Sequence, residues 1–140
     1  MRLILDASVA LKWVLNEDDS AAARLLRADY LAGEHEFIVP DILPVEIGHA
    51  LTKAERKGAI PVGNAALLAT RIILILPELY PNLDLISRAI DISSDYRIGV
   101  HDCVYVALAE QEGAPLITAD QKLITALQGD FPVLSLGDLP

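Results

Sequence analysis

Short apolar runs alternate with longer helix-like segments along this chain, and that alternation constrains its fold more than any other feature. Four runs read as buried strands: residues 2–5, 37–39, 116–118 and 133–136. Strands that alternate with helices favour a mostly parallel sheet covered on both faces. We therefore expect an α/β fold.

The segments between these runs carry helical patterns with matching start and stop residues. The expected helices cover residues 8–15, 20–32, 43–57, 61–76, 83–95, 100–112 and 121–127. Ser8 is a candidate N-cap for the first helix, and Gly33, Gly58 and Gly113 follow three of the others. We find no repeat, low-complexity tract or linker, so we expect a single domain over residues 1–140.

Composition narrows the class of protein. With 140 residues and a hydrophobic fraction of 53%, the chain can bury a core and is not disordered. Its single cysteine, Cys103, fits a reducing compartment. Only three apolar residues separate Arg2 from Asp6, too few for a signal peptide, and the apolar stretch 65–76 is short for a membrane span and contains Arg71. We expect a cytoplasmic protein with no membrane association.

Four acidic residues stand where the predicted elements begin or end: Asp6, Glu46, Asp102 and Asp120. Asp6 and Asp120 follow strands, whereas Glu46 and Asp102 lie in the first turns of helices. Ligands of parallel sheets bind outside the carboxyl ends of the strands. Carboxylates gathered there repel one another, and a hard cation reverses that penalty. The pattern indicates a site for one or two Mg²⁺ or Mn²⁺ ions and chemistry on phosphates.

Three segments resemble the PIN-domain family, and within it the VapC-type toxins of toxin-antitoxin modules: LDASVALKWVLNED, PDILPVEIGHAL and HDCVYVALAEQEGAPLITADQKL. They stand in the family's order, at similar separations, and together span nearly the whole chain. The resemblance implies a three-layer α/β/α PIN-like fold, a metal-dependent endoribonuclease acting on RNA, and a protein antitoxin as partner.

The same resemblance implies roles for the acids. Asp6, Glu46 and Asp102 match the three main metal-site acids of the family, and Asp120 matches a fourth, more variable one. Each acid also has a structural reading. Asp6 and Asp120 can cap helices, and Glu46 and Asp102 suit the dipole of a helix N-terminus. Four independent caps need not meet at one edge of a sheet, so we favour metal ligation, most modestly for Asp120.

Neighbouring polar residues are candidates for supporting roles. By the resemblance, Ser8 matches a small polar position near the first acid, and Thr118 matches a hydroxyl residue two positions before the last. His49 stands where the family commonly has Asn, one turn after Glu46. We interpret His49 and His101 as hydrogen-bonding or packing residues, because a hard cation prefers oxygen ligands.

The formal charge of -9 argues against a general nucleic-acid coat protein. Two Mg²⁺ ions would bring the total to -9 + 4 = -5. Four basic residues remain available for a local RNA groove, although they also suit a helix C-terminus: Lys12, Lys53, Arg56 and Lys57.

Two other functions stay open on the sequence. A phospho-acceptor receiver-like signalling domain would also be small, acidic and α/β, and Lys122 is its only candidate lysine near a strand end. A PIN-like scaffold that has lost catalysis is the second. The apolar residues 72–76 suggest a homodimer or antitoxin surface, although core burial explains them almost as well.

Overall fold

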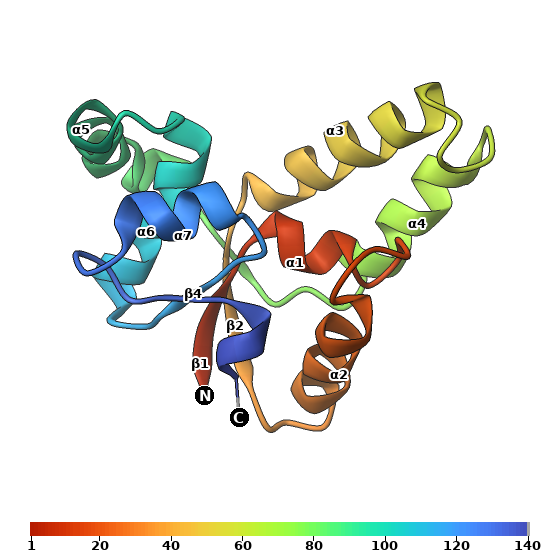
Figure 1. Cartoon of the computed structure of the whole chain (residues 1–140), viewed down its shortest axis with the longest axis horizontal. Helices are drawn as coiled ribbons and strands as arrows, with labels where there is room; N and C mark the ends of the chain where they lie inside the picture. The colour runs from red at the N-terminus through yellow and green to blue at the C-terminus, as the bar shows by residue number, and fades with distance from the viewer. Residues whose placement is uncertain (140) are drawn as a thin grey trace.

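A sheet of five parallel strands lies at the centre of the computed structural model, which describes residues 1–139 (Figure 1). The strands are β1 (Arg2–Leu5), β2 (Glu36–Pro40), β3 (Leu79–Tyr80), β4 (Leu116–Ile117) and β5 (Val133–Leu134). Their order in the sheet is β3-β2-β1-β4-β5. From β1 the chain adds β2 and β3 on one side, and then returns to add β4 and β5 on the other side of β1. The crevice between β1 and β4 is therefore the topological switch point.

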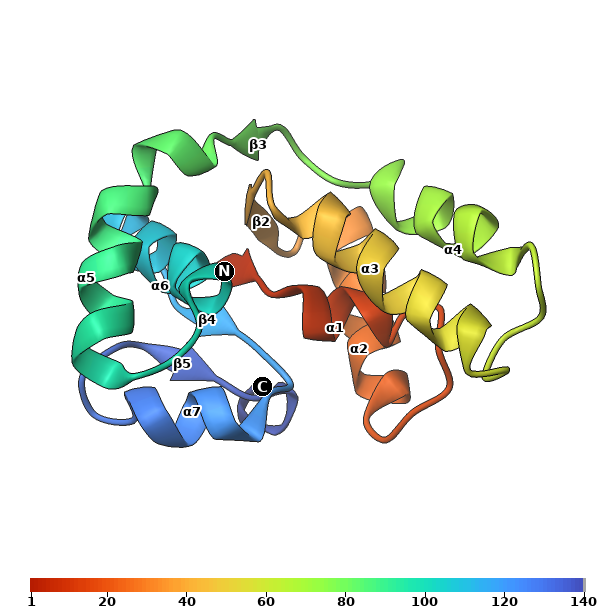
Figure 2. The ribbon, with the colours of Figure 1, turned by 90° about the horizontal axis from the view of Figure 1, so that it is seen from above.

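Helices cover both faces of this sheet. They are α1 (Ala7–Leu11), α2 (Ser20–Leu31), α3 (Leu43–Arg56), α4 (Asn64–Ile73), α5 (Ile86–Tyr96), α6 (Val100–Glu112) and α7 (Gln121–Leu127), with short 3-10 turns at Asn82–Asp84 and Leu136–Asp138. Helix α6 packs on β1, β2 and β4, and α5 packs on α6. Figures 1 and 2 place α5 and α6 on one side of the strands and α2, α3 and α4 on the other. The predicted three-layer α/β/α fold is confirmed.

Helix α6 is the most buried helix because it lies between the sheet and α5. Its residues from Cys103 to Ala109 are all buried. The helix ends at Gly113, whose φ of 60° belongs to the left-handed region that glycine adopts without strain. Burial raises the pKa of the Cys103 thiol to about 11, so this cysteine is a packing residue.

Helices α3 and α4 form a hairpin that projects away from α5 and α6 (Figure 2). One carboxylate joins them: Glu55 Oε2 accepts hydrogen bonds from the N–H groups of Gly63 and Ala65, each at 3.0 Å. These groups lie at the N-terminus of α4, where backbone donors lack helical partners and favour a negative charge. Glu55 thus holds the tip of the hairpin together.

The first helix differs from its prediction. It begins at Ala7 and ends at Leu11 rather than covering residues 8–15, and its N-cap is Asp6, so Ser8 is not the cap. The N–H groups that follow bond to carbonyls three residues back, in a tighter turn, at Lys12, Trp13 and Val14.

Two further differences lie in the middle of the chain. Helix α4 covers Asn64–Ile73, not 61–76, and β3 was not predicted, because two residues carry no periodic signal. The apolar run 72–76 is divided: Ile72 is fully buried, whereas Leu74 is 78% exposed.

No helix within residues 1–139 is both long enough and apolar enough to cross a bilayer.

Candidate metal site

A cavity of about 540 Å³ opens at the carboxyl ends of β1 and β4, and all four predicted acids line it. They come from four places in the chain: the end of β1, the first turn of α3, the first turn of α6 and the N-terminus of α7. Two imidazoles also line the cavity, whereas the described residues around it include no lysine and no arginine. The side chains that carry this chemistry are Asp6, Glu46, His49, His101, Asp102 and Asp120.

Asp6 is the deepest of the acids, with 5% of its surface exposed. Its backbone N–H donates to the carbonyl of Ile117 at 3.1 Å, which joins it to β4. Its Oδ2 accepts hydrogen bonds from Ser8 Oγ at 2.5 Å and from Thr118 Oγ1 at 2.8 Å. Burial raises the pKa of Asp6, the two hydroxyls oppose that shift, and the charge of Asp120 adds to it. The structure thus brings the predicted supporting hydroxyls to the predicted acid.

Asp120 caps α7 and borders the cavity at the same time. Its Oδ1 accepts hydrogen bonds from the N–H groups of Lys122 and Leu123, at 3.0 and 3.2 Å. Its own N–H donates to Thr118 Oγ1 at 3.1 Å. The capping role expected for Asp120 is therefore present, and the cap fixes the carboxylate at the rim of the cavity.

Glu46 is held by Tyr105, which was not among the predicted site residues. Tyr105 is fully buried, and its hydroxyl donates to Glu46 Oε1 at 2.6 Å. Burial raises the pKa of Glu46, this hydrogen bond lowers it, and the charge of Asp6 raises it further. One signal was available: Tyr105 follows Asp102 by three residues, which places both on one face of α6.

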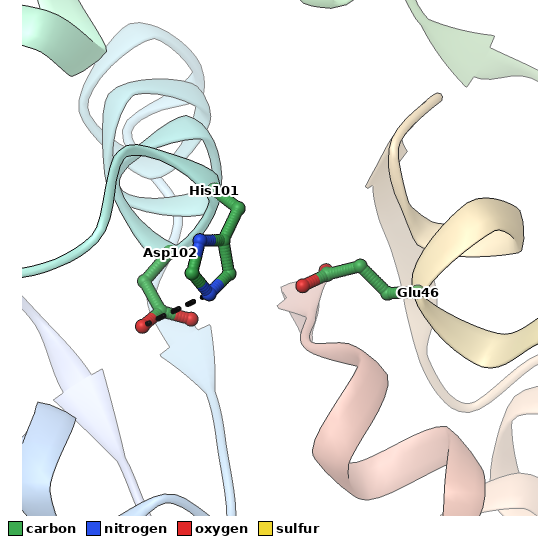
Figure 3. A group of neighbouring side chains, drawn as sticks. All are labelled: Glu46, His101 and Asp102. Atoms are coloured by element: carbon green, nitrogen blue, oxygen red, sulfur yellow. Dashed lines mark ion pairs between the residues drawn. The ribbon is translucent and has the colours of Figure 1, made fainter. Parts of the chain in front are cut away.

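Three side chains converge closely at the mouth of the cavity (Figure 3). Ligand atoms of Glu46, His101 and Asp102 lie within 4.8 Å of one another. His101 Nε2 is 3.9 Å from Asp102 Oδ2. Burial raises the pKa of Asp102, the neighbouring imidazole lowers it, and the charges of Asp6 and Asp120 raise it. The sequence interpretation did not place His101 in the metal site.

The donor set of this cavity fits a divalent cation. The pKa values of Asp6, Glu46 and Asp102 are all raised, mainly by burial, and the charge of at least one other acid of the cavity adds to each shift. Such a group is costly without a positive charge, and the described lining offers no lysine or arginine. Carboxylate oxygens are the ligands that Mg²⁺ and Mn²⁺ prefer. His49 lies one turn after Glu46 on α3 and borders the same cavity.

The chain belongs to the PIN-domain family: the PIN-domain model matches residues 3–126. Among known proteins, the chain is 32% identical to VapC ribonuclease Mb0985 of Mycobacterium bovis and to ribonuclease VapC9 of Mycobacterium tuberculosis. Each match spans 134 residues, 94% of this chain and 95% of the relative.

Solved structures share the fold at low sequence identity. PAE2754 from Pyrobaculum aerophilum superposes with a TM-score of 0.68 at 16% identity, covering 98% of this chain and 85% of that one. VapBC2 from Rickettsia felis, bound to a DNA fragment from its promoter, superposes with a TM-score of 0.63 at 15% identity, covering 96% and 98%.

Proposed function

We propose that this protein is a metal-dependent endoribonuclease that hydrolyses RNA phosphodiester bonds, and that it is the toxin of a type II toxin-antitoxin pair. One observation carries the proposal: four carboxylates from distant parts of the chain line one cavity whose described lining has no lysine or arginine. The relatives named as ribonucleases, which match along nearly their whole length, support the reaction class.

In this proposal Asp6, Glu46, Asp102 and Asp120 hold one or two Mg²⁺ or Mn²⁺ ions. When bound, the ion supplies an activated water nucleophile and offsets the charge that develops on the phosphate. The reaction therefore needs no side-chain nucleophile.

Hydroxyl side chains orient two of these carboxylates, Asp6 and Glu46. Ser8 and Thr118 leave Asp6 only limited freedom to rotate, because both hydroxyls bind the same oxygen. Tyr105 does the same for Glu46. Such second partners fix the direction of a ligand and strengthen metal binding.

The proposal also names the surroundings of the enzyme. Its partners are an RNA substrate and a protein antitoxin, and a solved relative described as a VapBC toxin-antitoxin system supports the latter. We further propose a cytoplasmic protein whose residues 1–140 form one domain. A homodimer is supported by the exposed apolar side chains of α4 and its C-cap, since Leu67, Ile73 and Leu74 are 52%, 43% and 78% exposed.

The alternatives fit the site less well. A receiver-like domain needs a lysine beside its acids, but Lys122 is exposed on α7 and is not among the residues that line the cavity. A scaffold without catalysis has no need of four carboxylates at one edge of the sheet. The set of acids therefore favours the enzyme.

Cleavage of a mixed RNA pool by purified, partner-free protein tests the proposal. We expect cleavage with Mg²⁺ or Mn²⁺, none with EDTA, and none from the Asp6→Ala/Asp102→Ala variant. A matched control is Asp84→Ala/Asp91→Ala, which removes two exposed acids outside the cavity lining and should cleave normally. Cleavage that persists in EDTA, or in the first variant, would contradict the proposal.

A further inference from the structure

The imidazole of His101 lies beside Asp102 and Glu46, a position that its place on α6 does not predict. His101 and Asp102 are consecutive on α6, and consecutive helical residues do not face each other. Their side chains nevertheless converge, with His101 Nε2 at 3.9 Å from Asp102 Oδ2 and both within 4.8 Å of a Glu46 oxygen (Figure 3). The ring must fold back over the start of α6 to reach this position.

Gly99 provides the space for that ring. A Cβ added at Gly99 would lie 2.6 Å from His101 Cε1 and 3.0 Å from His101 Nδ1, so the ring occupies the place of a side chain. The φ of Gly99 is -59°, which any residue adopts. Glycine therefore matters here because its missing side chain leaves room for the ring, and not because of its backbone conformation.

The described structure shows no hydrogen bond that accounts for this placement. The 3.9 Å separation from Asp102 exceeds the range of a hydrogen bond. Within residues 1–139 we find no hydrogen bond made by the His101 ring. A neutral imidazole offers one nitrogen lone pair, and here Nε2 shares a small space with two carboxylates on the rim of the cavity.

We propose that His101 Nε2 is a direct metal ligand beside Glu46 and Asp102, and that the site consequently takes Mn²⁺ or Co²⁺ in preference to Mg²⁺. Imidazole nitrogen suits transition metals, whereas Mg²⁺ favours oxygen alone, and affinity rises from Mn²⁺ to Co²⁺ for a given donor set. This assignment rests on the proposed function, because it requires that the carboxylates hold an ion. Gly99 acts as a positioning residue that keeps the ring in place.

Metal titration of the metal-free full chain tests the assignment without reference to activity. Affinities for Mg²⁺, Mn²⁺ and Co²⁺ would be measured by calorimetry, and the visible absorption of bound Co²⁺ would report on its ligands. We expect His101→Ala to weaken Co²⁺ binding about tenfold or more, to shift the Co²⁺ spectrum, and to leave Mg²⁺ affinity within about twofold.

Two further variants sharpen the result. Gly99→Ala should reproduce the loss of Co²⁺ affinity while keeping the imidazole, because the new methyl group displaces the ring. His35→Gln removes an imidazole outside the cavity lining and should leave the three metal affinities and the Co²⁺ spectrum unchanged. Unchanged Co²⁺ affinity in His101→Ala, or an equal loss for Mg²⁺ and Co²⁺, would overturn the ligand assignment alone. No binding of any of the three ions by the wild-type protein would overturn the proposed function as well.

Discussion

The central sheet has two edges, formed by the amino ends and the carboxyl ends of its parallel strands, and they differ in how their charged side chains are paired. At the amino ends of β1 and β2, Arg2 forms two ion pairs. Its Nη2 lies 3.2 Å from Glu112 Oε1, and its Nε lies 3.5 Å from Glu36 Oε2. Hydrogen bonds from Gln111, Tyr80 and Arg2 lower the pKa of Glu112. At this edge, carboxylates are matched by positive charge and by donors, in contacts that are ordinary features of a protein surface.

At the carboxyl ends of β1 and β4 the balance is reversed. Asp6, Glu46 and Asp102 have raised pKa values because they are desolvated and because neighbouring carboxylates of the cavity add to the shift. The hydroxyls of Ser8 and Tyr105 orient carboxylates but bring no charge. Stability alone would not gather acids in this way. The difference between the two edges supports the proposal that the second edge holds a metal cation.

The largest expected effect comes from a ligand at the acidic edge. Asp102→Asn removes one charge at nearly constant shape, and we expect RNA cleavage to fall by more than about a hundredfold, beyond the usual cost of losing an outer contact. Glu36→Gln makes the same change at the opposite edge and should leave cleavage unchanged. Similar rates for the two variants would erase the distinction between the edges.

The next largest effect is expected from losing a hydroxyl group that orients Glu46. Tyr105→Phe deletes the hydroxyl that binds Glu46 Oε1, and we expect metal affinity to fall about tenfold while the fold is retained. Tyr80→Phe deletes a hydroxyl that binds Glu112 and should leave metal affinity unchanged. Calorimetric titration with Mn²⁺ compares the two variants, and equal affinities would show that Tyr105 serves packing alone.

The acidic edge should also have a distinct pH dependence in the metal-free protein. Folding raises the pKa of Asp6, so the folded state binds its proton more tightly, and the contribution of Asp6 to stability falls as pH rises from about 4 through the raised pKa. Asp6→Asn should therefore be more stable than the wild type at neutral pH, with the difference vanishing in acid. Urea unfolding across this pH range measures the difference, and a less stable variant at neutral pH would contradict the account.

The smallest effect belongs to the matched edge. Arg2→Gln removes partly exposed ion pairs with Glu112 and Glu36, so we expect a loss of only about 0.5 kcal/mol, smaller still at high salt. Cleavage of RNA should not change. Thermal unfolding at two salt concentrations, alongside the cleavage assay, would reveal any coupling between the edges.

Much of the fold was predictable because it depends on periodicity. The apolar runs at β1 and β4 and the helical pattern of α6 are enough to predict that Asp6, Asp102 and Asp120 lie at one end of the sheet. Strand β3 escaped prediction, since its two residues form a strand only through pairing with β2. The early end of α1 likewise depends on local hydrogen bonds rather than on pattern.

The rest of the site depends on side-chain direction, which one sequence does not specify. Tyr105 was not among the predicted site residues, and only the assembled fold shows that its hydroxyl, on α6, reaches Glu46 on α3. The sequence interpretation of His101 is a hydrogen-bonding or packing residue, and the turn of its ring toward Asp102 depends on the space above Gly99. Such contacts become visible only when distant segments are assembled.

The most direct test of the account is Mn²⁺ binding by the metal-free protein, compared with Asp6→Asn and measured by calorimetry. The account predicts that the wild type binds one or two ions and that the variant, although folded, loses that binding. Wild-type protein that binds no Mn²⁺, or a variant that binds it equally tightly, would contradict the claim that this edge of the sheet is a metal site.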